Sequence, residues 1–138
     1  MIFLNPRKRL TAKFLGVKNI FPCTVAETSE NYFIWDFDGI KVKTNPDSRF
    51  NEGDKAFLCI KPPDIRLIIN DKQVDNIFDV TVSHVIPLEK TQRVFLRFPQ
   101  TRFNLIMDIE KLACEKWKIE LGDKVKVSMR KDRIFLAE

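Results

Sequence analysis

Short runs in which hydrophobic and polar residues alternate recur along most of the 138-residue chain. Successive side chains of a β-strand point to opposite faces of a sheet, so alternation over about four to eight residues predicts a half-buried strand. Turn residues separate the runs. We predict strands at 24–26, 32–37, 40–42, 55–60, 80–84, 94–98, 103–107 and 125–129. Many short strands with few helices indicate an all-β sandwich or barrel.

One segment, 109–118, has a different periodicity. Its apolar residues fall at roughly helical spacing: Ile109, Leu112, Ala113 and Trp117. Such a spacing gives a helix one apolar face. Asp108 stands just before the segment, where a carboxylate can accept hydrogen bonds from the first free backbone N–H groups. We therefore predict one short helix near 109–118, capped by Asp108.

The chain contains an internal repeat. Segment 18–25 matches segment 75–82, because both carry Asn-Ile-Phe and Thr-Val at the same spacing, 57 residues apart. Gly-Asp-Lys occurs at 53–55 and again at 122–124, 69 residues apart. The second copy is therefore longer, and the predicted helix accounts for the extra residues where the first copy has a turn, at 45–48. Copies this small bury little core alone, so we expect them to pack on each other, with strands exchanged between them.

Three of the four glycines mark turns in this pattern. Gly53 and Gly122 stand at equivalent places before a strand, where a positive φ lets the chain reverse tightly. Gly39 follows Asp38, and this dipeptide between two strand patterns predicts a two-residue hairpin.

Composition indicates a soluble globular protein, with 44% hydrophobic and 31% charged residues. No apolar run reaches the roughly 20 residues that cross a bilayer, and we expect neither export nor a membrane span.

Cys23, Cys59 and Cys114 form no C-x-x-C pair, and we interpret them as reduced core residues of a cytosolic protein. Of the net charge of +5, five cations precede the first acidic residue: Arg7, Lys8, Arg9, Lys13 and Lys18. The excess is thus N-terminal and does not indicate a basic binding face.

The sequence contains no recognised catalytic or metal-binding motif. There is no G-x-x-x-x-G-K-[ST] phosphate loop and no G-x-S-x-G nucleophile motif. The single histidine, His84, cannot form an H-E-x-x-H zinc pair, and we interpret it as a surface or structural strand residue. We expect no catalytic residue, resident cofactor or metal in this chain.

Aromatic residues could form a stacking platform for single-stranded nucleic acid. Phe33, Trp35 and Phe37 alternate along one predicted strand, which is typical of core filling. Arg93, Phe95 and Arg97 share one side of another strand whose opposite side is apolar, which indicates a solvated outer face. We therefore expect no nucleic-acid partner.

Three segments resemble parts of ABC-importer ATPases. Residues 3–19, with Asn-Pro followed by Ala-Lys-Phe-Leu-Gly-Val-Lys-Asn, resemble the join between the nucleotide-binding domain and the transport-associated OB (TOBE) domain. Residues 60–67 resemble the strand that closes the first OB module in that family. Residues 76–136 are similar to the molybdate-binding Mop modules of oxyanion importers.

This resemblance implies an all-β fold of two tandem OB-like barrels with one short helix. Residues 1–18 would be a linker, 19–70 the first module and 71–138 the second, Mop-like module. The chain would be a non-catalytic regulatory and dimerisation region of an ATP-binding subunit, with ATP and Mg²⁺ bound elsewhere in the parent polypeptide. Its partners would be the nucleotide-binding domain, a two-fold mate and, indirectly, the membrane permease at the cytoplasmic face. A free-standing oxyanion-binding protein and an OB-fold nucleic-acid binder are the alternatives.

The resemblance also implies a candidate oxyanion site for molybdate, tungstate or sulfate. Mop modules hold the anion with backbone N–H groups of a turn before the first strand, and the matching turns here are 16–19 and 73–76. With basic residues of the last hairpin, the candidate site residues are Lys18, Asn19, Asp75, Asn76, Arg130 and Lys131.

Asp75 opposes anion binding at the second turn. A carboxylate at ~4 Å repels one unit of anion charge by about 4 kcal/mol at an effective dielectric of ~20. A charged hydrogen bond returns only about 1.5–3 kcal/mol. Two outcomes are open, retained oxyanion binding and a structural or regulatory module that has lost its ligand.

Overall fold

The computed structural model describes residues 19–68, 75–99, 101 and 103–138. Its strands are β1 (Asn19–Thr28), β2 (Phe33–Phe37), β3 (Ile40–Thr44), β4 (Lys55–Ile60), β5 (Ile65–Leu67), β6 (Ile77–Pro87), β7 (Thr91–Arg97), β8 (Asn104–Glu110), β9 (Lys124–Met129) and β10 (Phe135–Ala137). The described residues also form one α-helix, α2 (Lys111–Lys116), and the 3-10 turns η2 (Pro62–Asp64) and η3 (Lys131–Arg133). Each of the eight predicted strands lies on an observed strand, and the predicted all-β class is confirmed.

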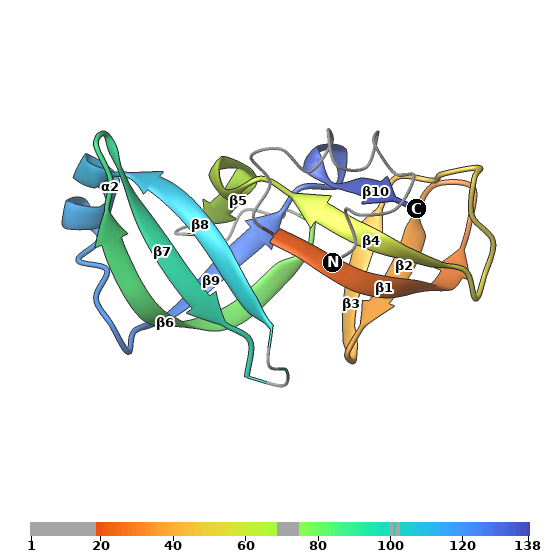
Figure 1. Cartoon of the computed structure of the whole chain (residues 1–138), viewed down its shortest axis with the longest axis horizontal. Helices are drawn as coiled ribbons and strands as arrows, with labels where there is room; N and C mark the ends of the chain where they lie inside the picture. Colours follow the sequence, from red (N-terminus) through yellow and green to blue (C-terminus); the bar gives the residue numbers. More distant parts are fainter. Residues whose placement is uncertain (1–18, 69–74, 100, 102) are drawn as a thin grey trace, which may run out of the picture.

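The strands form two five-stranded antiparallel sheets that lie side by side (Figure 1). One sheet has the order β10-β4-β1-β2-β3 and the other the order β5-β9-β6-β7-β8. Strand β5 follows β4 in the chain but pairs with β9, and strand β10 follows β9 but pairs with β4. The last strand of each repeat therefore completes the sheet of the other repeat.

The buried side chains form a core that runs through both sheets. In β2, burial alternates, with Phe33, Trp35 and Phe37 facing inward as the pattern predicts. Phe21 stacks on Phe37 at 4.8 Å between ring centroids, and Phe98 of the other half meets Phe37 edge-on at 5.7 Å. Offset or edge-on aromatic pairs of this kind add stability beyond buried area. The two repeats thus share one aromatic contact region.

The repeat extends to backbone irregularities. The register of β1 shifts between Val25 and Glu27, and that of β6 shifts between Val82 and His84. In the first half, the Val25 N–H donates to the carbonyl of Asp54 and the Gly53 N–H donates to the carbonyl of Val25, both at 2.9 Å. In the second half, Val82, Asp123 and Gly122 make the same pair of bonds, both at 2.8 Å.

The predicted glycine turns are confirmed. Gly53 and Gly122 have φ of 89° and 93°, a region in which other residues are strained. Asp38 and Gly39 have φ of 53° and 90°, and positive φ at both positions is the requirement of a type I′ hairpin turn. The predicted turn at 45–48 closes slightly later, where the Phe50 N–H donates to the carbonyl of Asp47 at 3.1 Å.

The predicted helix is shorter and oriented differently than expected. Helix α2 covers only Lys111–Lys116, and the predicted cap by Asp108 is wrong because Asp108 lies in β8 and binds Arg93 at 2.8 Å. The residue before the helix is Glu110, which makes no side-chain cap bond. Leu112 is 76% exposed and Cys114 is buried, so the apolar face read from the sequence is not the buried face. The prediction that the three cysteines are core residues is confirmed, since Cys23, Cys59 and Cys114 are all buried.

Candidate functional site

Asn76 joins the two repeats through its side-chain amide. Its backbone has a left-handed φ of 56° just before β6 begins. The amide oxygen accepts from the Lys43 N–H at 2.7 Å, and the amide nitrogen donates to the carbonyls of Lys43 at 2.7 Å and Met129 at 2.8 Å. The side chain therefore binds β3 of the first half as a paired strand would, and it also binds the end of β9.

Asn19 makes the equivalent contact in the opposite direction. Its amide oxygen accepts from the Ile106 N–H at 2.7 Å, and its amide nitrogen donates to the carbonyl of Ile106 at 2.8 Å. Lys43 and Ile106 hold equivalent positions in the two repeats. Lys43 pairs with Ile34, and Ile106 pairs with Phe95. Ile34 and Phe95 are in turn the partners of the first paired residue after the register shift in β1 and in β6. We call these two contacts the asparagine clamps, Asn19 on β8 and Asn76 on β3. Both amides are committed to backbone partners.

Charged residues gather around the Asn76 clamp. The Lys131 ammonium lies 3.9 Å from the Asp75 carboxylate, and the Arg130 guanidinium donates to Asp132 at 3.1 Å. The Lys43 ammonium lies 4.7 Å from the centroid of the Tyr32 ring, within the range of a cation–π contact. Since η3 packs beside β3, this region contains residues from both repeats. We call it the Asn76 junction.

The structure thus brings four of the six sequence-predicted site residues together, namely Asp75, Asn76, Arg130 and Lys131. Asn19 occupies the equivalent place at the other clamp, where η2 packs against β8. Lys18 and the turn residues 16–18 and 73–74 lie outside the described residues. Pro62 stands 69 residues before Lys131 and therefore at the equivalent position in the first repeat. The region around the Asn19 clamp thus has no counterpart of the Lys131 charge.

Sequence reasoning missed what the asparagines do. The resemblance places Asn19 and Asn76 in anion-binding turns, and in the structure their side-chain amides hold a strand of the opposite repeat. The available signal was their place as the first residue of a duplicated Asn-Ile-Phe motif. A repeated polar residue that begins two strands is a candidate for a repeated structural contact.

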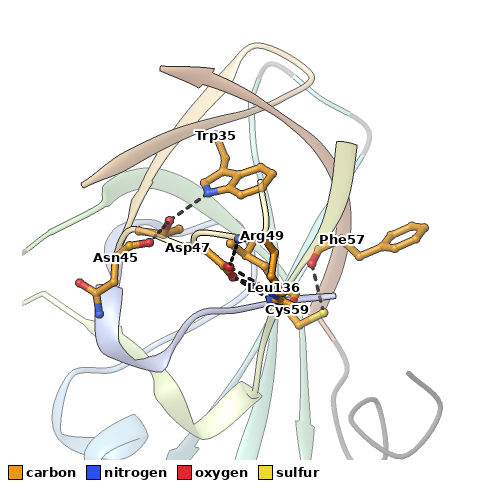
Figure 2. Close-up of polar contacts among 8 residues, drawn as sticks. Trp35, Asn45, Asp47, Arg49, Phe57, Cys59 and Leu136 are labelled. Carbon is orange, nitrogen blue, oxygen red and sulfur yellow. Dashed lines mark hydrogen bonds and ion pairs between the residues drawn. The ribbon is translucent and has the colours of Figure 1, made fainter. Parts of the chain in front are cut away.

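A second polar cluster fixes the loop after β3 (Figure 2). The Arg49 guanidinium donates to both carboxylate oxygens of Asp47, to Oδ1 at 3.0 Å and to Oδ2 at 2.7 Å, and to the carbonyl of Leu136 in β10 at 2.9 Å. The buried Trp35 indole N–H donates to the Thr44 hydroxyl at 2.9 Å. This cluster holds the exchanged strand β10 and the interior of the first sheet.

Nucleophilic chemistry is not supported by the cysteines. Burial raises the pKa of the Cys23 thiol to about 12, so the thiol stays protonated at neutral pH. Burial also raises the pKa of Cys114. Among the described residues, no group of three or more His, Cys, Asp or Glu side chains is placed to hold a metal ion.

Comparison with solved structures gives a protein of similar fold. The structure is similar to the crystal structure of the cytoplasmic molybdate-binding protein ModG with molybdate bound, with a TM-score of 0.75 and 17% sequence identity. The likeness covers 87% of this chain and 95% of that one. At this identity the likeness shows the fold, a tandem OB-like arrangement, as the sequence predicts.

Two proteins are similar to this chain in sequence, and both are ATP-binding proteins of importers. The chain is similar to the spermidine/putrescine import ATP-binding protein PotA of Hahella chejuensis, with 31% identity over 67 residues that make up 48% of this chain and 18% of the relative. It is also similar to PotA of Photobacterium profundum, with 26% identity over 88% of this chain and 38% of the relative. The chain thus spans well under half the length of these relatives. No family profile matches it.

Likeness in fold and likeness in sequence together support a TOBE-like domain of an ABC importer. This agrees with the resemblance noted in the sequence. Within the described residues, no helix has the length and apolar character needed to span a bilayer.

Proposed function

We propose that this chain is a non-catalytic regulatory and dimerisation domain of an ABC-transporter ATP-binding subunit. The observation that carries the proposal is the match of 88% of this chain to only 38% of a PotA relative. A folded body with its own core, corresponding to a minor part of an importer ATPase, is what an accessory domain requires. The sequence of this chain contains no phosphate loop, so ATP and Mg²⁺ would bind elsewhere in the parent subunit.

Regulation would act through the arrangement of two such subunits. The domain would contact its nucleotide-binding domain and a two-fold mate, and through them the permease at the cytoplasmic face of the membrane. A ligand that binds one arrangement more tightly shifts the equilibrium between open and closed ATPase dimers by its differential affinity, and by no more than that. Molybdate, tungstate or sulfate is the proposed class of ligand, and the fold likeness to a molybdate-binding protein supports it.

A tag at the C-terminus of the chromosomal gene tests the proposal. We expect the tagged polypeptide, after subtraction of the tag, to exceed the 16.2 kDa of this chain, to hydrolyse ATP and to co-purify with a membrane permease. Deleting residues 19–138 from that polypeptide should leave ATP hydrolysis and remove its response to the transported solute. A product of 16.2 kDa plus the mass of the tag, without ATPase activity or permease, contradicts the proposal.

A free-standing oxyanion-binding protein is the second candidate. The specific observation in its favour is the extent of the likeness to ModG, which covers 95% of that chain. The same tag distinguishes the candidates, because a free-standing protein would appear at 16.2 kDa. It would also bind molybdate in the absence of any ATPase.

A further inference from the structure

We propose that the Asp75 carboxylate is a built-in anion that closes the Asn76 junction to free oxyanions. The inference rests on the proposed accessory role and restricts its ligand, because an oxyanion that regulates the domain would not bind at the Asn76 junction of the unaltered chain. In this chain the junction would take a tetrahedral dianion such as molybdate or sulfate only after Asp75 is removed. The second repeat would then serve as a structural element, held by an internal charge in place of a bound ion.

The cations of the junction are already paired with groups of the same chain. Lys131 lies 3.9 Å from the carboxylate of Asp75. Arg130 lies 3.1 Å from the carboxylate of Asp132, and the Lys43 ammonium lies over the ring of Tyr32. An oxyanion entering from solution would meet cations whose charge is already partly neutralised by these intramolecular partners.

Asp75 is held in place by its neighbour. Asn76 has a left-handed backbone and makes three side-chain hydrogen bonds to Lys43 and Met129. The carbonyl of Asn76 accepts a further bond from the Met129 N–H at 3.1 Å, one residue before Arg130 and two before Lys131. The start of β6 and the end of β9 therefore cannot separate without breaking the clamp, which keeps the backbone of Asp75 beside that of the hairpin that carries Lys131.

A tethered carboxylate competes strongly with a free ion. A group linked through a short segment acts at an effective concentration of about millimolar or above. Free oxyanion must exceed that concentration to replace it. Asp75 and Lys131 are 41% and 32% exposed, so water and ions reach the pair and the competition is not blocked by burial.

Calorimetric titration with sodium molybdate, at fixed ionic strength and pH 7.5, tests the inference. The variant is Asp75→Asn, which removes the carboxylate and keeps the shape of the side chain. The matched control is Asp79→Asn, because Asp79 also pairs with a lysine, Lys126 at 3.0 Å, and its loss changes the net charge equally. The double variant Asp75→Asn with Lys131→Met tests whether the ammonium is the group that binds.

We expect the unaltered protein and Asp79→Asn to bind molybdate no tighter than about millimolar. Asp75→Asn should bind about thirtyfold tighter, the factor that removing one repulsive charge at ~4 Å gives a dianion at the dielectric of bulk water. The double variant should lose this gain. A second variant, Asp75→Ser, should bind like Asp75→Asn, and a thermal unfolding scan of each variant checks that it is folded.

Three results overturn the inference. They are tight molybdate binding by the unaltered protein, an equal gain in Asp79→Asn, and no gain in either folded Asp75 variant. None of these results bears on the proposed accessory role, which the purification of the tagged parent polypeptide tests separately. Conversely, a free-standing 16.2 kDa product would remove the accessory role and leave the titration interpretable.

Discussion

The two repeats share several backbone features and differ in the side chains of their buried interiors. Both have an asparagine clamp, a bulge in the first strand and a glycine turn bonded to that bulge. The buried centre differs, because the hydrogen-bonded pair Trp35 and Thr44 of the first repeat is replaced by Leu96 and Met107 in the second. Backbone geometry is thus the part of the repeat that the fold requires. The core tolerates different chemistry where volume is kept and polar groups are paired.

The second difference lies in the loop between the third and fourth strands. The short loop of the first repeat contains Arg49, which holds β10, while the second repeat inserts α2. Phe50 and Ile119, each three residues before the glycine of its turn, both point into the core with 6% and 8% exposure. The insertion therefore leaves the anchor residue in place and changes only what lies outside it.

The largest expected effect compares the two interiors. Trp35 has 0% exposure, and Trp35→Ala should lower the free energy of unfolding by about 4 kcal/mol because it opens a large cavity. Leu96→Ala, at the equivalent position, should cost about 3 kcal/mol. Urea unfolding followed by circular dichroism measures both.

Trp35→Phe is the control, since it keeps most of the apolar volume and removes the bond to Thr44. We expect a loss of about 2 kcal/mol, composed of a hydrogen bond and a small cavity. Equal losses for Trp35→Phe and Trp35→Ala would show that the ring is not packed as described.

Strand positions and turns were predictable because alternation, positive-φ glycines and repeated motifs are local in sequence. Asp38-Gly39 and the turns at Gly53 and Gly122 follow from local sterics alone. An exchange of strands between the repeats was expected, but the pairing of β5 with β9 and of β10 with β4 depends on contacts between residues 60 or more positions apart, and the sequence offers no local signal for which strands pair. The same holds for the clamps, whose partners lie 87 and 33 residues away.

The helix shows where periodicity misleads. Leu112 and Trp117 fall on one face of a helix by their spacing, yet both are exposed. The residues of this segment that are buried are Cys114 and Ile119. The reason is that β8 extends to Glu110 and uses Asp108 for a cross-strand pair with Arg93, which rotates the short helix that follows. A six-residue helix has too few turns for its apolar pattern to fix its orientation.

The next effect compares the two clamps. Asn76→Ala removes three hydrogen bonds and places alanine at a left-handed φ, so it should cost about 3 kcal/mol. Asn19→Ala removes two hydrogen bonds from a residue with 1% exposure and should cost about 2 kcal/mol. Urea unfolding measures the difference between the clamps.

Asn76→Gly separates the two contributions at Asn76. Glycine accepts the left-handed backbone, so this variant should recover about 1 kcal/mol relative to Asn76→Ala. A larger loss for Asn19→Ala than for Asn76→Ala would reverse the ranking. The stability of the clamp would then follow burial more than the number of bonds.

A smaller effect is expected at the exchanged strands. Arg49→Met removes the bond to the Leu136 carbonyl, and because the Arg49 side chain is 40% exposed we expect a loss of about 1 kcal/mol. Amide hydrogen exchange should become about fivefold faster in β10, which is the factor that corresponds to this energy. The amides of β5, in the other sheet, serve as the internal control and should not change. Equal acceleration in both strands would mean that the substitution loosens the whole protein.

The smallest effect compares the β2–β3 hairpin of the first repeat with the β7–β8 hairpin of the second. Asp36 and Lys41 pair at 2.9 Å across the first hairpin, and Arg97 and Asn104 occupy the equivalent positions in the second. The hydrogen bond from Lys41 lowers the pKa of the Asp36 carboxyl from its usual value. Both ends of the pair are open to solvent, so Asp36→Asn should cost only about 0.5 kcal/mol at pH 7. Asparagine keeps an acceptor for the Gly39 N–H, so the substitution removes mainly the charge.

The pH dependence of this loss identifies its cause. A carboxyl whose pKa is lower in the folded state stabilises fully above its unfolded pKa of about 3.9, and the stabilisation disappears as the pH falls through the lower folded value. The stability difference between the unaltered protein and Asp36→Asn should therefore be constant from pH 7 to about 5 and vanish in stronger acid. Arg97→Gln at the equivalent position is the control, because it removes no carboxyl group and the stability change that it causes should stay constant. A difference for Asp36→Asn that persists at pH 2 would assign the loss to hairpin geometry, and the charge of Asp36 would then not distinguish the two repeats.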